Sequence, residues 1–313
     1  MPLGSLSFQD STVKTLSGYL MIGLIRLMSL LPLSLAQGVG RLLGRMLWIR
    51  RTRAREVARV NLSMVYPDMP EQERDALLKS TLLHNGMVAA EMGMLWGRSP
   101  DASLKLIRQV HNEELLQQAL EDDRGLLLLA PHIGNWELLN QYLAQRTDMT
   151  IMFKPAKNPV FDEWMKQRRE LIGARLVPTT AGGVRSLFKA LQRGQAVGFL
   201  PDQEPERRSG VMVPFMEVPT LTPRMPFELL QRTKAHALMV FAVRLPNSEG
   251  FDIHLLEADE QIYSTDPMES SEGLNKSVEQ VVATAPEQYQ WTYKRFKRPP
   301  EGGRNPYKVA GVP

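Results

Sequence analysis

The feature that most constrains the fold is a run of four leucines, Leu126–Leu129, which is followed closely by the start of a helix. A short, wholly apolar run is typical of a strand that is buried on both faces, as in a parallel sheet. The run ends at Ala130-Pro131, and Asn135 then has the residue type and the position of a helix N-cap. The segment predicts a strand, a turn and a helix, with His132 in the turn and Glu137 in the first helical turn. A histidine and a carboxylate can meet across such a turn, whereas at a spacing of five they would point apart on one helix.

Predicted strands and helices alternate through the middle of the chain. The expected strands are 126–130, 149–153, 175–177, 196–200, 211–215, 236–244 and 251–256. The expected helices are 51–64, 71–96, 136–145, 159–172, 183–192, 226–234 and 271–285. Alternation of this kind is typical of an α/β fold with a mostly parallel sheet that is flanked by helices.

Polar residues follow four of these strands. They are His132, then Lys154 and Lys157, then the segment 179–183, and then Asp202. Because the functional crevice of a parallel sheet lies beyond the carboxyl ends of its strands, we expect these residues to share one edge. Each loop could be polar for ordinary reasons, but four chemically useful loops together favour a site.

The chain is expected to have four parts. Residues 1–60 form apolar and basic membrane-anchoring helices, 61–100 a helical appendage packed on the catalytic domain, 101–300 that domain, and 301–313 an irregular tail. The twenty residues from Leu16 to Leu35 carry a single charge, Arg26, and have the length of a membrane span. A central arginine costs about 2.5–3.5 kcal/mol on insertion scales, so an interfacial helix or a hairpin with 38–49 is an equal alternative. The arginines that follow place the remainder of the chain in the cytoplasm under either interpretation.

Composition excludes several classes of site. There is no cysteine, and hence no disulfide, thiolate nucleophile or cysteine metal site. The sequence also lacks a G-x-S-x-G elbow, a P-loop, a G-x-G-x-x-G after a strand and an H-E-x-x-H motif. The net charge of +4 suggests anionic partners, and the arginines at 41–59, next to an apolar segment, favour a lipid surface over nucleic acid. A second basic cluster lies at 294–308.

The hexad His132-Ile-Gly-Asn-Trp-Glu137 resembles the H-x4-[D/E] motif of the bacterial lipid A late acyltransferases, the lauroyl/myristoyl transferase family. Further segments are similar to that family and stand in its order: Lys154–Pro159, Arg168-Arg169, Gly182–Leu187, Leu200–Glu204, Gly210–Phe215, Pro286–Trp291 and Arg295–Lys297. Two positions depart from the family pattern: Glu217 stands where glycine is common, and Tyr293 where histidine is often found. These departures concern the acceptor and the acyl length rather than the reaction.

The resemblance implies a glycerolipid-acyltransferase-like fold and transfer of a fatty acyl chain from acyl carrier protein to a hydroxyl of a Kdo-linked lipid A precursor. It also implies an enzyme at the cytoplasmic face of the inner membrane that needs no metal, other cofactor or nucleic acid. His132 would be the general base and Glu137 the carboxylate that orients it. The expected substrate-binding residues are Asn135, which also caps the helix, Asp202 on the far wall of the site, and four basic residues that could meet the acceptor phosphates: Lys154, Lys157, Arg168 and Arg169.

Three alternatives remain open at this point. The acceptor could be another membrane lipid, such as an ornithine lipid or a glycolipid. The chain could be a catalytically silent membrane adaptor, although His132 and Glu137 are both present. It could also be a thioesterase, in which water replaces the acceptor hydroxyl.

Overall fold

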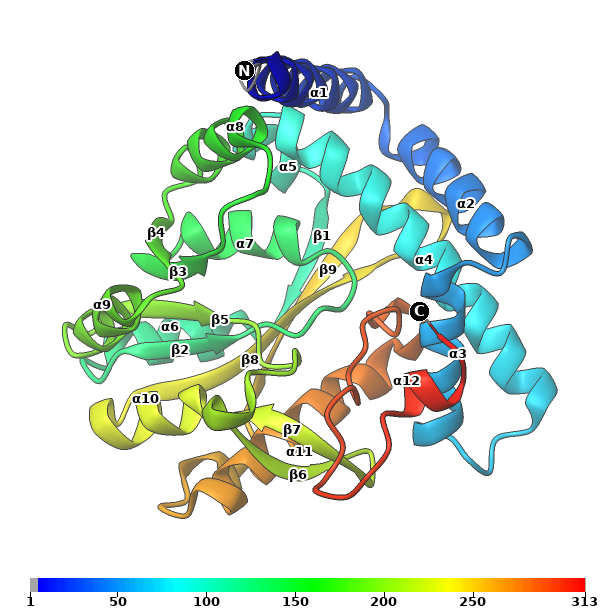
Figure 1. Ribbon diagram of the computed structural model, residues 1–313. Helices are drawn as coiled ribbons and strands as arrows, with labels where there is room; N and C mark the ends of the chain where they lie inside the picture. Colours follow the sequence, from blue (N-terminus) through cyan, green and yellow to red (C-terminus); the bar gives the residue numbers. More distant parts are fainter. Residues whose placement is uncertain (1–4, 313) are drawn as a thin grey trace.

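A seven-stranded sheet runs through the centre of the structure (Figure 1). The computed structural model describes residues 5–312, and the side chains from residue 15 onward. The strands lie in the order β1 (Ile107–His111), β9 (Phe251–Glu257), β8 (His236–Arg244), β2 (Leu126–Leu129), β5 (Ala196–Phe199), β3 (Met149–Phe153) and β4 (Arg175–Pro178). All neighbouring strands are parallel except β8 and β9. The predicted α/β fold with a mostly parallel sheet is confirmed.

The four leucines of β2 form the centre of this sheet. Each of them is fully buried, and β2 pairs with β8 on one side and with β5 on the other. Because both faces of β2 are covered, every position in the strand is apolar, which is why its sequence does not alternate.

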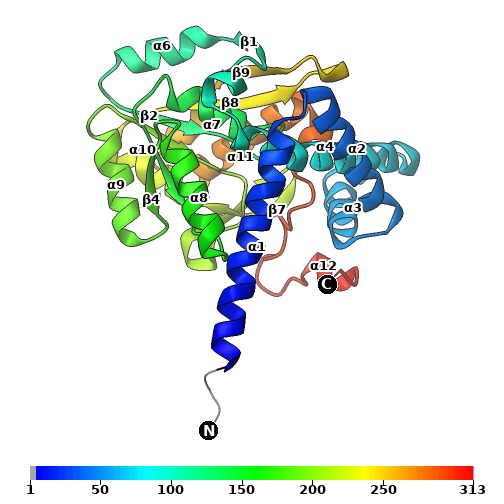
Figure 2. The same ribbon diagram turned by 90° about the horizontal axis from the view of Figure 1, so that it is seen from above.

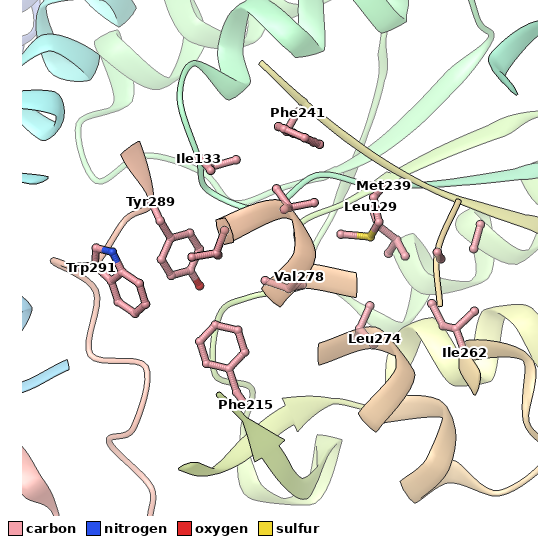
Figure 3. Packing of buried hydrophobic residues seen from close by; sticks show 14 of the residues in the cluster. Leu129, Ile133, Phe215, Met239, Phe241, Ile262, Leu274, Val278, Tyr289 and Trp291 are labelled. Carbon is pink, nitrogen blue, oxygen red and sulfur yellow. The ribbon is translucent and has the colours of Figure 1, made fainter. Parts of the chain in front are cut away.

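Helices cover both faces of the sheet. Residues of α6 (Glu113–Glu121) and α7 (Trp136–Ala144) pack against one face of the sheet and form one hydrophobic cluster with it. A larger cluster on the other face includes residues of α3 (Arg53–Val65), α4 (Glu71–Gly97), α9 (Ala181–Leu191), α10 (Met225–Thr233) and α11 (Pro267–Thr284). In this cluster Ile133, just after β2, lies near Tyr289, and Phe215 and Val278 lie beyond them (Figure 3). The turn that carries His132 therefore rests on a packed core.

The N-terminal apolar segment is divided between two helices. α1 (Ser5–Ser29) extends beyond the body of the molecule, and α2 (Leu33–Ile49) runs along α4 (Figures 1 and 2). The apolar stretch 16–35, considered as a single span or as an interfacial helix, is not one helix, because the chain breaks at 30–32 and Pro32 caps the start of α2. No helix among residues 5–312 is long and apolar enough to cross a bilayer.

Glycines hold α2 against α4. A Cβ added at Gly40 would lie 2.4 Å from the Cα of Met87, and one added at Gly86 would lie 2.1 Å from the carbonyl oxygen of Gly40. Gly44 meets the backbone of Leu82 in the same way. Only glycine permits two helix backbones to approach this closely, so α2 has little freedom to shift on α4.

Several elements differ from expectation. β1, α6 and β7 (Val218–Pro223), which pairs with β6 (Gly210–Phe215), were not predicted from the sequence. Two helices not yet described are α5 (Pro100–Leu104) and α8 (Pro159–Glu170). The tail from residue 301, expected to be irregular, contains α12 (Pro306–Val309) and buries Tyr307. α3 and α4 share a cluster with the sheet, as an appendage packed on the catalytic domain would; the four boundaries stay predictions.

Candidate active site

His132 lies at the carboxyl end of β2 and is held by the carboxylate of Asp202. Its Nδ1 lies 2.7 Å from Oδ1 of Asp202, and its backbone N–H donates to Oδ2 at 2.8 Å. Asp202 follows β5, the strand next to β2, so the two residues meet across neighbouring strand ends. Both are buried, at 6% and 3% exposure. The expectation that residues after these strands would lie together at one edge of the sheet is confirmed for this pair.

The structure does not show the predicted pairing of Glu137 with His132. Among the described residues, no hydrogen bond joins these two side chains, and Oε1 of Glu137 instead accepts from Arg169 at 3.0 Å. The physical reason is the strand order, which puts the Asp202 carboxylate directly beside Nδ1. Glu137 still lines the same cavity as His132, together with Arg169.

The surroundings of Asp202 favour its ionised form. Burial alone would raise the pKa of Asp202, but the electrostatic interaction with His132, two hydrogen bonds from His132 and the charge of Arg295 hold that pKa below its ordinary value. Arg295, in the basic cluster at 294–308, is buried and donates to the carbonyl oxygen of Leu221. Burial, followed by the charge of Asp202, raises the pKa of Tyr289 well above its ordinary value.

The Nε2 atom of His132 is placed to accept a proton. With the Nδ1 proton donated to Asp202, Nε2 carries the lone pair, and the side-chain amide of Gln203 lies 3.2 Å from it. The indole of Trp136 meets the imidazole edge-on, with ring centres 5.1 Å apart. Gln203 and Trp136 were within the motifs read from the sequence, but their contacts depend on the fold of both loops.

The turn between His132 and α7 has a backbone conformation that favours glycine. Gly134 has a φ of +54°, and a Cβ there would lie 1.7 Å from the carbonyl oxygen of Ala242. Asn135 then caps α7 as predicted, because its Oδ1 accepts from the N–H of Leu138 at 3.0 Å. Its side chain is fully buried, and Nδ2 donates to Glu91. The expectation that Asn135 also contacts substrate is therefore not supported by its position.

An apolar cavity of about 500 Å³ opens beside His132. This volume is within the usual range for small-molecule sites, about 300–1,000 Å³. Its polar lining residues are His132, Glu137, Asn140 and Arg169. The remaining lining residues are apolar or glycine, and come from α4, β2, α7, β3 and β5: Met92, Trp96, Leu128, Ala130, Trp136, Leu139, Leu143, Met149, Ile151, Met152, Gly198, Phe199 and Leu200. The site thus combines a histidine that can act as a base with a cavity whose lining is mostly apolar.

The structure separates the predicted basic residues. Arg169 lines the cavity, whereas Arg168 donates to the backbone carbonyl of Arg98, and burial lowers the pKa of Arg168. Lys154 and Lys157 are exposed in the loop after β3. The segment 179–183 follows β4, three strand spacings or about 14 Å from β2, so it is not brought to His132.

The one group of possible metal ligands in the described part of the chain lies elsewhere. It consists of His111, Asp252 and His254 on β1 and β9, at the edge of the sheet. The two imidazoles are stacked, with centres 4.3 Å apart and an interplanar angle of 12°. Parallel rings cannot both aim in-plane lone pairs at one ion, so this arrangement fits packing better than coordination.

Comparison with known proteins agrees with this site. Residues 7–298 match the family described as bacterial lipid A biosynthesis acyltransferase. A lipid A biosynthesis lauroyltransferase of Escherichia coli (strain K12) is 28% identical over 285 residues, which cover 91% of this chain and 92% of that protein. The palmitoleoyltransferase of the same organism is 27% identical over 287 residues, with the same coverage, and its myristoyltransferase is 25% identical over 258 residues, or 82% and 79%. A match across nearly the whole chain, with the motif histidine at the mouth of an apolar cavity, leads to one conclusion: the chain belongs to the bacterial lipid A biosynthesis acyltransferase family.

Proposed function

We propose that the protein transfers a fatty acyl chain from acyl carrier protein to a hydroxyl of a Kdo-linked lipid A precursor. The observation that carries this proposal is the Asp202–His132 pair beside an apolar cavity, in a chain of this family. The related E. coli proteins are named for lauroyl, palmitoleoyl and myristoyl transfer, so the donor chain is a long one.

His132 acts as a general base in direct acyl transfer, and the enzyme forms no covalent acyl intermediate. Nε2 takes the proton of the acceptor hydroxyl as its oxygen attacks the thioester carbonyl carbon. Asp202 keeps Nδ1 protonated and stabilises the imidazolium that forms. The tetrahedral intermediate then expels the thiolate of the donor, and the thiolate takes the proton from Nε2. The Gln203 amide, 3.2 Å from Nε2, must yield this position to the hydroxyl.

The first turn of α7 can receive the oxyanion of that intermediate. Among the described residues, the backbone N–H groups of Trp136 and Glu137 have no hydrogen-bond acceptor, and they stand at the positive end of the helix dipole. Arg169 adds a positive charge at the same cavity, next to Glu137. Donors placed in this way stabilise developing charge with little reorganisation.

The cavity accommodates the acyl chain. Its lining of leucine, methionine, isoleucine and phenylalanine offers no side-chain partner to a polar substrate beyond His132 and the three other polar residues. Each methylene that leaves water contributes about 0.8 kcal/mol to binding. An extended chain in this cavity would therefore bind tightly with its carbonyl carbon at the polar end.

Basic residues are proposed to meet the phosphates of the acceptor. Arg169 is in the cavity wall, and Lys154 and Lys157 are exposed on the loop after β3, at the same edge of the sheet. Arg168 is proposed to act indirectly: it donates to the Arg98 carbonyl and so holds the end of α4. Acyl carrier protein, an acidic partner, would dock on exposed basic surface, and this association should weaken with salt.

The proposed location is the cytoplasmic face of the inner membrane. α1 and α2 expose large apolar side chains. They include Leu20 and Leu24 on α1, Leu30 directly after it, and Leu35 and Ile49 on α2. An exposed apolar surface of this extent, with arginines close in sequence, is typical of helices that lie in a lipid interface.

The decisive experiment supplies the purified protein with lauroyl- or myristoyl-acyl carrier protein and a Kdo-linked lipid A precursor in mixed vesicles. Mass spectrometry of the lipids should show one added acyl chain, and the His132→Ala protein should show none. The matching acyl-CoA should be a poorer donor at low ionic strength.

Other results would overturn the proposal. Acylation of an ornithine lipid or a glycolipid in preference to the lipid A precursor would change the acceptor class. Release of free fatty acid without transfer would indicate a thioesterase. A protein that binds membranes but neither transfers nor hydrolyses would be an adaptor.

A further inference from the structure

A buried ion pair lies directly behind the turn that carries His132. Glu91 of α4 and Arg244 at the end of β8 are 0% and 4% exposed. Their contact is bidentate, with Nε and Nη2 of Arg244 each 2.5 Å from one carboxylate oxygen. Burying two charges is costly, and a well-packed apolar pair is often as stable. Such a pair is therefore expected to have a further role, and its other hydrogen bonds identify that role.

Glu91 and Arg244 each hold one part of the turn. Oε2 of Glu91 accepts from Nδ2 of Asn135 at 3.1 Å, and Asn135 caps α7 through its other side-chain atom. Arg244 holds the turn through Gln288. The side-chain oxygen of Gln288 accepts from the N–H of Arg244, and the backbone carbonyl of Gln288 accepts from the N–H of Gly134 at 3.2 Å. The residues between His132 and α7 are thus tied to the ion pair at two points.

The same carboxylate is bonded to α2. Nε2 of Gln37 donates to Oε1 of Glu91 at 2.8 Å, and Gln37 is 1% exposed. Arg244, Gln37 and Asn135 together supply four donors, which saturate the carboxylate. Two hydrogen bonds in series, Gln37 to Glu91 and Asn135 to Glu91, connect α2 to the start of α7. Because glycines fix α2 on α4, Gln37 cannot shift independently of that connection.

We propose that Glu91 is the positioning residue of the catalytic turn, and that Gln37 makes the position of this turn depend on helix α2. The proposal rests on the proposed function, since it explains how the base and the α7 N–H groups are held for transfer. Glu91 touches neither the cavity nor His132, so it acts only through Asn135 and Arg244. α2 exposes apolar side chains on its outer side, so the part of the enzyme proposed to lie on lipid is also the part that orders the active site.

Two substitutions cut this connection without removing the ion pair. Asn135→Ser keeps a good N-cap oxygen but loses the amide donor to Glu91. Gln37→Met keeps the volume of the side chain and removes the donor from α2. The matched control is Thr81→Val, because Thr81 is buried on α4 and, among the described residues, its hydroxyl has no partner.

We expect Asn135→Ser and Gln37→Met each to lower kcat about 10-fold to 100-fold, with KM within about twofold, and Thr81→Val to leave both unchanged. The double variant should be no slower than Asn135→Ser alone, because both changes act through one carboxylate. Hydrogen exchange at residues 132–138 should speed up in both variants while Tm stays close to that of Thr81→Val.

Each outcome decides between positioning and a general structural role. Wild-type kcat in Gln37→Met, strictly additive losses in the double variant, or a loss of kcat that follows a lower Tm would overturn the proposal. The exchange measurement needs no substrate, so it tests the positioning of the turn even if wild-type enzyme proves not to transfer acyl chains. Unchanged exchange at 132–138 in both variants would also overturn it.

Discussion

Asp202 holds His132 through two hydrogen bonds, one from the ring Nδ1 at 2.7 Å and one from the backbone N–H at 2.8 Å. One carboxylate therefore fixes both the rotation of the ring and the path of the turn that carries it. The arrangement leaves Nε2 unbonded to Asp202, and His132 lines a cavity that Glu137 and Arg169 also line. Glu137 is then free for a separate role, which is to hold Arg169.

The first prediction separates the roles of the two carboxylates. Asp202→Asn replaces one acceptor oxygen by an NH2 group that faces an N–H donor of His132. The rate of acyl transfer should fall by about 10²–10⁴-fold. Steady-state kinetics of acyl transfer measure this fall, which follows because the amide no longer orients the imidazole as the carboxylate does.

Glu137→Gln serves as the comparison for that experiment. It keeps an acceptor for Arg169 and removes the charge. We expect it to lower the rate less than Asp202→Asn does, because Glu137 contacts Arg169 and not His132. The assignment of Asp202 fails if Glu137→Gln lowers the rate more than Asp202→Asn does.

The second prediction concerns the backbone of the turn. Gly134→Ala forces a Cβ to within 1.7 Å of the Ala242 carbonyl at a positive φ, so the turn cannot keep its shape. Activity should be lost, and unfolding should occur at a lower temperature in calorimetry. Gly182→Ala is the matched control: its nearest neighbour would be the Thr180 hydroxyl at 3.6 Å, and it should behave as wild type.

The sequence predicted the fold more completely than it predicted the site. Leu126–Leu129 identified a central strand because burial on both faces leaves an unbroken apolar run. The partner of His132 was not predictable, because it depends on β5 lying next to β2, and strand order is a long-range property. Local spacing pointed to Glu137, which lies five residues from His132 in sequence, whereas Asp202 lies seventy residues away.

The N-terminal region and the buried network show the same limit. The apolar composition of 16–35 was evident, but the break at 30–32 and the packing of α1 and α2 on α4 depend on tertiary contacts. Glu91 carried no sequence signal beyond a charge among apolar residues of a helix. Its partners, Arg244 and Asn135, lie on distant segments.

The third prediction tests the cavity as the acyl site. A Cβ at Gly198, on β5, would lie 2.7 Å from Cγ2 of Ile151 and 3.2 Å from the sulfur of Met149, both of which line the cavity. Gly198→Ala should therefore narrow the cavity and shift the preference toward shorter donors, measured by competition between acyl carrier proteins of different chain length. Gly38→Ala on α2, with no atom within 4 Å of its Cβ, should leave the preference unchanged. An unaltered preference in Gly198→Ala would place the acyl chain elsewhere.

The fourth prediction is a loss of stability in mild acid. Burial, and then the charges of Arg244 and Arg41, lower the pKa of His84 to about 3, and its Nδ1 accepts from Arg244. The unfolded chain binds a proton at its ordinary pKa of 6.5, so stability is full above that value and decreases as pH falls toward 3. Between pH 7 and pH 5 the free energy of unfolding should fall by at most about 2 kcal/mol from this group.

Urea unfolding at the two pH values measures this contribution. His84→Gln keeps an acceptor for Arg244 without titrating, so its stability should depend less on pH. Thr81→Val, one turn earlier on the same helix, should keep the wild-type dependence. An equal dependence in wild type and His84→Gln would show that His84 does not titrate as its burial implies.

The last prediction concerns the exposed apolar surface of α1. Leu20, Leu24 and Leu27 are 66%, 61% and 60% exposed, and lie at helical spacing on that helix. Full burial of one leucine contributes about 1.5–3 kcal/mol, so replacing all three by serine should weaken binding to anionic vesicles by at least about a hundredfold in cosedimentation. Leu171→Ser, at a leucine that is 64% exposed just after α8, is the control and should bind as wild type. Equal binding by the triple variant and wild type would show that another surface holds the enzyme on the membrane.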